Sequence, residues 1–137
     1  MNCGQKEKCR NHGPEPYVTN ISKQALDNSD FRVALWTGDC LQMTLMCIPV
    51  CGDIGVEIHE DTDQLIRIEY GDACVMMGKN KNLQDFCRNM CCGDAVFVPA
   101  GTWHNVINTG KDVLKVSSVY APPHHKRNTI QCTKNKY

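Results

Sequence analysis

The chain has 137 residues, and its 15 Lys and Arg residues balance its 15 Asp and Glu residues, so the formal net charge is zero. This balance provides no broad basic surface, so neither nucleic acid nor a membrane is an expected partner. No apolar run approaches the length of a membrane span, and the first residues are polar, so we expect a cytoplasmic protein. The length suits one domain with one sizeable core.

Ten cysteines are spread along the chain without a regular framework. In a reducing cytoplasm such cysteines are free thiols more often than disulfides. A free cysteine packs as a small hydrophobic residue, so we expect mainly packing roles for them.

Composition divides the chain into an N-terminal arm at residues 1–30, a β-rich body at residues 31–121 and a polar tail at residues 122–137. The arm is polar at its start, contains Gly and Pro, and includes one segment, residues 21–28, that suits a helical turn. We therefore expect the arm and the tail to lie outside the main fold.

Short runs with strand character fill the body of the chain, and two of them flank Gly38 and Asp39 as a predicted hairpin. Residues 79–92 show no clear pattern. Many short strands separated by turns favour an all-β sandwich or closed barrel. The expected strands are residues 31–36, 41–48, 56–59, 64–69, 73–77, 95–98, 105–107 and 113–120.

Four residues in this body form a plausible first shell for one divalent metal: Glu57, His59, Gln64 and His104. Strand side chains alternate between faces, so Glu57 and His59 point the same way and reach one place from one segment. The other two donors come from different expected strands. They can meet only if the sheet curls around them, which favours a barrel with the metal site inside.

The two segments that carry these residues resemble the two motifs of the cupin superfamily. The second motif, Gly, five residues, Pro-x-Gly, two residues, His, three residues, Asn, is matched from Gly93 to Asn108. In the first motif, Glu57 stands at the position of the first histidine and Gln64 at that of the glutamate. The resemblance covers roughly residues 31–121. It implies a cupin-type antiparallel β-barrel, or jelly roll, with a short N-terminal arm, a bound divalent metal (zinc, iron, manganese or nickel) and a homodimer.

Within the superfamily, the chain looks like small bacterial cupins labelled mannose-6-phosphate isomerase-like. That resemblance implies a metalloenzyme that isomerises a small polar, sugar-like substrate by Lewis-acid chemistry. Glu57 is the nearest candidate for a catalytic base if it does not bind the metal. Two alternatives stay open: a non-haem iron oxygenase that uses the same donors, and a non-catalytic cupin that binds a small ligand.

Strand parity also predicts the residues that contact the substrate. Ile66, Phe97 and Val106 are expected to face inward beside the ligands, and Trp103 is expected to cover the mouth of the barrel or to pack its end. No arginine or lysine is expected in the interior, which counts against a phosphorylated substrate.

Overall fold

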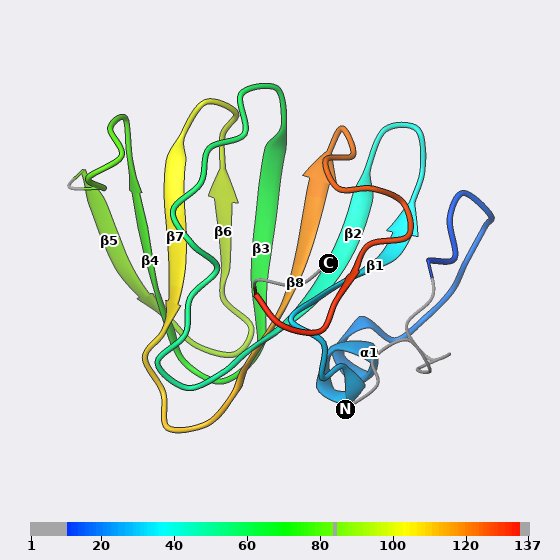
Figure 1. The fold of residues 1–137 in the computed structure, drawn as a ribbon, viewed down its shortest axis with the longest axis horizontal. Coiled ribbons are helices and arrows are strands. Elements are labelled where there is room, and N and C mark those ends of the chain that lie inside the picture. Colours follow the sequence, from blue (N-terminus) through cyan, green and yellow to red (C-terminus); the bar gives the residue numbers. More distant parts are fainter. Residues whose placement is uncertain (1–10, 84, 135–137) are drawn as a thin grey trace.

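The computed structural model describes residues 11–83 and 85–134, which form one short helix and nine strands in two antiparallel sheets (Figure 1). The six-stranded sheet has the order β6-β3-β8-β2-β1-β9, and the three-stranded sheet has the order β5-β4-β7. This architecture confirms the expected antiparallel β-barrel. The first ten residues of the predicted arm and the last three of the tail lie outside the described residues. The elements are α1 (Ile21–Asp27), β1 (Arg32–Thr37), β2 (Gln42–Ile48), β3 (Asp63–Tyr70), β4 (Ala73–Gly78), β5 (Phe86–Met90), β6 (Ala95–Val98), β7 (Trp103–Asn108), β8 (Leu114–Ala121) and β9 (Ile130–Gln131).

The predicted hairpin joins β1 to β2, and its turn is closed by the Gly38 N–H, which donates to the Leu41 carbonyl at 2.9 Å. The register pairs Arg32 with Met46 and shifts between Ala34 and Trp36, where a bulge bends the strand. The hairpin is therefore confirmed, with a bend that helps the sheet to curl.

Two apolar clusters hold the barrel together, one on each face of the six-stranded sheet. The interior cluster fills the space between the two sheets and includes Ile66, Val106 and Met46. The outer cluster packs Val33 and other apolar side chains against α1. Strands β1 and β2 are consequently buried on both faces, and this double burial decides where their polar side chains lie.

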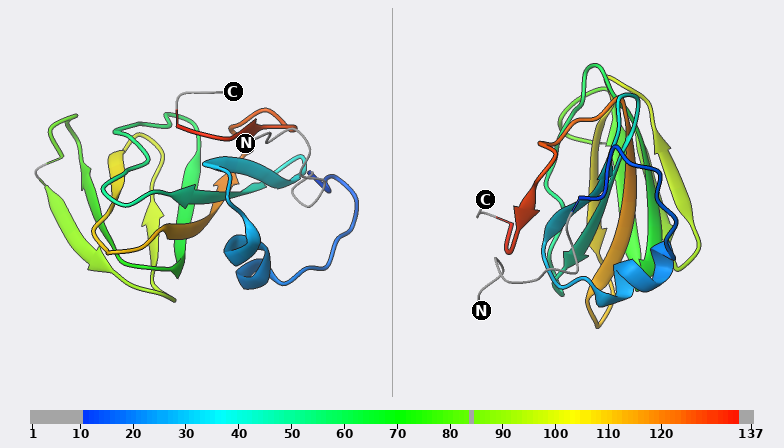
Figure 2. Two further views of the ribbon diagram at one scale, coloured as in Figure 1. Left: turned by 60° about the horizontal axis from the view of Figure 1, so that its bottom comes forward. Right: turned by 90° about the vertical axis from the view of Figure 1, so that its right-hand side faces the viewer.

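Helix α1 covers the outer face of the six-stranded sheet (Figure 2). Asn20 caps its first turn because its side chain accepts a hydrogen bond from the Lys23 N–H at 2.9 Å. The helix has only seven residues, so it depends on packing of the fully buried Ala25 rather than on its own propensity. This helix confirms the turn expected at residues 21–28. No helix in the described ranges is long and apolar enough to cross a membrane.

Two strands lie where no strand was expected, and one expected strand is absent from the described chain. Strand β5 lies within residues 79–92, and β9 lies in the tail and pairs with the edge of β1. Residues 56–59 contribute only an isolated bridge. Most of β5 is exposed and polar, so its alternation is weak and its pairing with β4 defines it.

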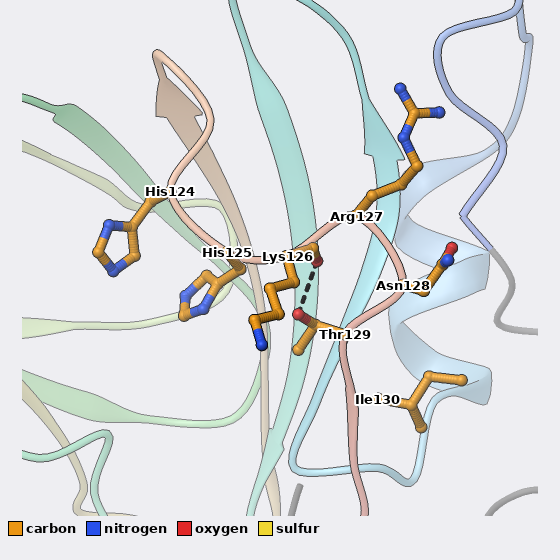
Figure 3. Close-up of a pocket in the computed structure, with 7 residues that line it drawn as sticks. All are labelled: His124, His125, Lys126, Arg127, Asn128, Thr129 and Ile130. Carbon is orange, nitrogen blue, oxygen red and sulfur yellow. Dashed lines mark hydrogen bonds between the residues drawn. The ribbon is translucent and has the colours of Figure 1, made fainter.

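Residues 122–129, here called the C-terminal strap, connect β8 to β9 and cross the sheet on the side opposite α1 (Figures 2 and 3). The fully buried Gln42 of β2 anchors the strap. Its Oε1 accepts from the N–H groups of His124 and His125, and its Nε2 donates to the His125 carbonyl. The strap is thereby fixed over the interior of the barrel.

Seven cysteines in the described part of the chain are free thiols, as expected. Cys132 differs because it is disulfide-bonded, which corrects the expectation for that residue.

Candidate metal centre

The centre is built on a backbone pairing between Glu57 and His104. The Glu57 N–H donates to the His104 carbonyl at 3.0 Å, and the His104 N–H donates to the Glu57 carbonyl at 2.9 Å. Two residues that exchange both bonds stand directly opposite each other in an antiparallel pair, so their side chains share a face. His59 follows two residues after Glu57 and its carbonyl accepts from the Gly101 N–H, which keeps this segment beside the loop before β7.

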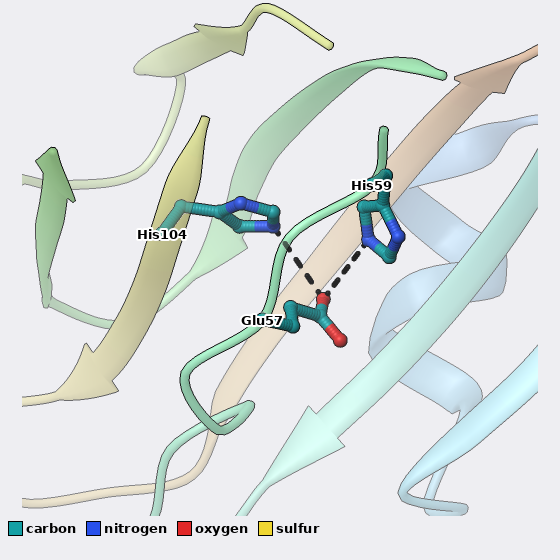
Figure 4. A group of neighbouring side chains, drawn as sticks. All are labelled: Glu57, His59 and His104. Carbon is teal, nitrogen blue, oxygen red and sulfur yellow. Dashed lines mark ion pairs between the residues drawn. The ribbon is translucent and has the colours of Figure 1, made fainter. Parts of the chain in front are cut away.

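Three donor groups converge at this point, namely Glu57, His59 and His104 (Figure 4). Their ligand atoms all lie within 4.8 Å of one another. Oε1 of Glu57 is 3.3 Å from Nε2 of His59 and 3.5 Å from Nε2 of His104. The two imidazoles are 4% and 0% exposed, and the carboxylate is 26% exposed. The predicted convergence of these three residues is therefore observed.

The donor atoms of this trio lack hydrogen-bond partners. Glu57 Oε1, both ring nitrogens of His59 and Nε2 of His104 are buried and unpartnered. In His104, Nδ1 lies 3.0 Å from the Thr102 carbonyl, which can only accept, so Nδ1 carries a proton and Nε2 is the nitrogen that faces the trio. Buried polar atoms rarely remain unpaired without a function. Two imidazoles and a carboxylate with free donor atoms fit a divalent transition metal.

The electrostatics of the site keep Glu57 ionised. Burial alone would raise the pKa of Glu57, but the neighbouring imidazoles of His104 and His59 outweigh it and hold this pKa well below its ordinary value. A carboxylate that stays ionised inside a barrel is a suitable anionic metal ligand.

Gln64 lies on β3, where it pairs with Val98 on one side and Tyr120 on the other. It is 4% exposed, and its Oε1 is buried without a partner. It shares its strand face with Ile66, which belongs to the interior cluster, so the amide faces into the barrel. Its role as a fourth ligand stays a prediction.

Two further aromatic rings lie beside His59. The ring centroid of His59 is 4.1 Å from that of His124 and 5.7 Å from that of Tyr120. Tyr120 is fully buried on β8, whereas His124 is exposed on the strap. His124 therefore stands between His59 and solvent, although the tail was expected to lie outside the main fold.

The four predicted substrate contacts occupy different places. Ile66 and Val106 face the interior and are 1% and 0% exposed. Phe97 is 74% exposed, so its expected inward position is wrong. It pairs with Leu65 on the outer face, because Val96 and Val98 supply the inward positions of β6. Trp103 has the opposite parity to His104 and lies near Lys81, whose Nζ is 5.9 Å from its ring centroid.

The expectation of an interior without basic residues is also wrong. Arg32 is 7% exposed, and its Nη2 lies 3.8 Å from the sulfur of Met46, a member of the interior cluster. Val33 and Leu35 of β1 belong to the outer cluster, so the alternate position of Arg32 faces the other side of the sheet. The outer apolar residues of β1 pack under α1, which sends Arg32 into the barrel.

Comparisons with known proteins agree with this fold and site. The cupin family profile, described as "Cupin", matches residues 40–135. The Bacillus subtilis protein YrkC is 50% identical over 125 residues, which cover 91% of this chain and 67% of YrkC. The crystal structure of BH2720 from Bacillus halodurans matches with a TM-score of 0.90 and 49% identity, covering 91% of this chain and 95% of that one. The structure of TT1209 from Thermus thermophilus shares the fold, with a TM-score of 0.65, 19% identity and coverage of 77% and 96%. The profile match extends over more than half of the sequence, and the chain belongs to the cupin family.

Proposed function

We propose that the chain is a metalloprotein that holds one divalent metal at Glu57, His59 and His104, with Gln64 as a weaker fourth donor. The observation that carries this proposal is the group of buried donor atoms without hydrogen-bond partners, gathered within 4.8 Å. Zinc, iron, manganese and nickel all suit two imidazoles and a carboxylate.

The proposed activity is isomerase-like chemistry on a small polar, sugar-like substrate. A bound divalent metal supplies Lewis-acid polarisation of a carbonyl or hydroxyl oxygen. The residues of the chain orient this centre: Thr102 fixes the tautomer of His104, and Glu57 contributes the negative charge. Glu57 remains the candidate base for proton transfer if Gln64 takes its place among the ligands.

A second candidate function, a non-haem iron oxygenase, is favoured by the composition of the trio. Two histidines and one carboxylate form the donor set used by iron(II) oxygenases, in which the remaining positions stay open. The two functions differ in metal selectivity and in the need for oxygen. Anaerobic and aerobic assays of the iron- and zinc-loaded protein on a panel of sugars separate them: turnover without oxygen supports the isomerase.

Elemental analysis of protein purified without an affinity tag tests the metal site. After loading with zinc or iron, wild type should hold about one metal per chain, and His104→Ala should lose most of it. Gln64→Ala should lose less, because a neutral amide is the weakest of the four donors. His12→Ala is the matched control, since His12 stacks on Tyr17 at 4.1 Å and is not one of the trio.

Two results would overturn the proposed centre. Equal metal content in wild type and His104→Ala would mean that His104 is a structural residue. A wild-type protein that takes up none of the four metals would leave a cupin that binds its ligand without metal chemistry.

A further inference from the structure

Arg32 is a buried cation that no carboxylate neutralises within the described part of the chain. Its Nη1 donates to Gln131 Oε1 at 2.7 Å, and its Nη2 lies 3.8 Å from the sulfur of Met46. Its Nε is buried and has no partner. Burying a guanidinium without a counter-ion is strongly unfavourable. A buried arginine without a carboxylate partner therefore points to an anion that is supplied by a ligand.

The side chains around Arg32 form a second polar group in the barrel, next to the metal centre. Thr44, diagonal to Arg32 across the β1–β2 pair, has a buried Oγ1 without a hydrogen-bond partner. Tyr120 is diagonal to Thr44 across the β2–β8 pair, and its hydroxyl oxygen is 3.2 Å from Nε2 of His125. The group therefore offers one fixed positive charge and unused hydrogen-bond donors.

Tyr120 connects this group to the metal centre. Its ring centroid is 5.7 Å from that of His59, and its strand position is diagonal to Thr44. A small molecule that contacts Arg32 at one end can therefore present its other end to Glu57, His59 and His104.

The strap also lines a cavity. Among the described residues, a cavity of about 630 Å³ is lined by His124–Ile130 (Figure 3). Lys126 and Arg127, both exposed, add positive charge along the same segment. Positive charge beside a cavity favours approach of an anion.

We propose that Arg32, Thr44 and Tyr120 form a binding site for a carboxylate group, so that the ligand of this barrel is a small organic acid rather than a phosphate ester. The planar guanidinium offers parallel N–H donors that match the two oxygens of a carboxylate. A carboxylate balances the single charge of Arg32, whereas a dianionic phosphate adds a second, unbalanced negative charge in a buried site. The role of this acid as a substrate of the metal centre rests on the proposed function. Carboxylate binding at Arg32 is independent of that function.

Binding is measured by NMR on the full-length chain, labelled with nitrogen-15 and freed of metal with a chelator. The probes are propionate, the uncharged propionamide and inorganic phosphate. We expect propionate to shift the Arg32 Nε–H signal in a saturable way, propionamide to leave it unchanged, and phosphate to bind more weakly. Arg32→Gln should weaken propionate binding at least tenfold, while Arg88→Gln, a change at an exposed arginine on β5, should leave it unchanged.

The wild-type signal alone decides the proposal if Arg32→Gln does not fold. Equal responses to propionate and propionamide, or tighter binding of phosphate than of propionate, would overturn it. Unchanged propionate affinity in folded Arg32→Gln would do so as well. Zinc content of Arg32→Gln should equal that of wild type, so loss of the carboxylate site and failure of the metal site give different results.

Discussion

Replacing Gln42 with leucine tests whether one buried amide holds the strap over the candidate site. Gln42 is fully buried, and its amide makes four hydrogen bonds. Three of these go to the backbone of His124 and His125, at 3.2, 2.8 and 2.9 Å, and the fourth goes to Thr37 Oγ1 at 3.0 Å. Leucine has a similar size and removes all four bonds.

The expected loss of stability follows from these contacts. A hydrogen bond contributes about 1 kcal/mol net, so four bonds set a scale of about 4 kcal/mol. His124 is exposed and His125 is half-buried, so water can replace part of what their backbone groups lose. We therefore expect Gln42→Leu to lower the free energy of unfolding by about 2–4 kcal/mol.

Urea unfolding followed by fluorescence measures this loss, and hydrogen exchange of the His124 and His125 amides locates it. Gln24→Leu is the control. Gln24 lies half-buried on α1, and its side chain donates hydrogen bonds to Tyr17 and Thr19, at 3.3 and 3.1 Å, and none to the strap. That change should cost less than about 1 kcal/mol. A Gln42→Leu protein with the stability of the control and unchanged exchange at both amides would show that the strap is held by other contacts.

Much of the fold and the trio of the candidate site could be predicted from the sequence, because the decisive signals are local. The spacing from Gly93 to Asn108 places His104 on a strand after a Pro-x-Gly turn, and the structure has that strand as β7. The alternation of Glu57 and His59 holds even though their segment forms a bridge rather than a strand. Short-range geometry alone is enough to point these side chains to one place.

The errors occur where burial depends on a distant element. In β6, residues 96–98 are all apolar, so the sequence does not show which of them face the interior. Only the pairing of Phe97 with Leu65 shows that Phe97 faces outward. The interior position of Arg32 was not predicted, because a strand with one solvent-exposed face and a strand covered by α1 show the same alternation. His124 could not be found because its place over His59 depends on Gln42, 82 residues earlier.

Three further predictions concern association, thiol chemistry and pH. We expect a homodimer, and light scattering at micromolar concentration that gives a monomeric mass would contradict it. The Sγ atoms of Cys74 and Cys87 are 3.1 Å apart on neighbouring strands, so treatment with diamide should join them, with a loss of two hydrogens by intact mass. Alkylation of both Cys74 and Cys87 after oxidation, located by peptide mapping, would contradict this. Burial, followed by the charge of Arg32, lowers the pKa of His125 from 6.5 to about 3. Because the unfolded chain takes up this proton first, His125 makes the free energy of unfolding fall as the pH drops from 6.5 toward 3. Between pH 7 and pH 4.5, urea unfolding should therefore show a smaller loss of stability for His125→Gln than for wild type. Equal losses in the two proteins would mean that His125 is protonated as readily in the folded state as in the unfolded chain.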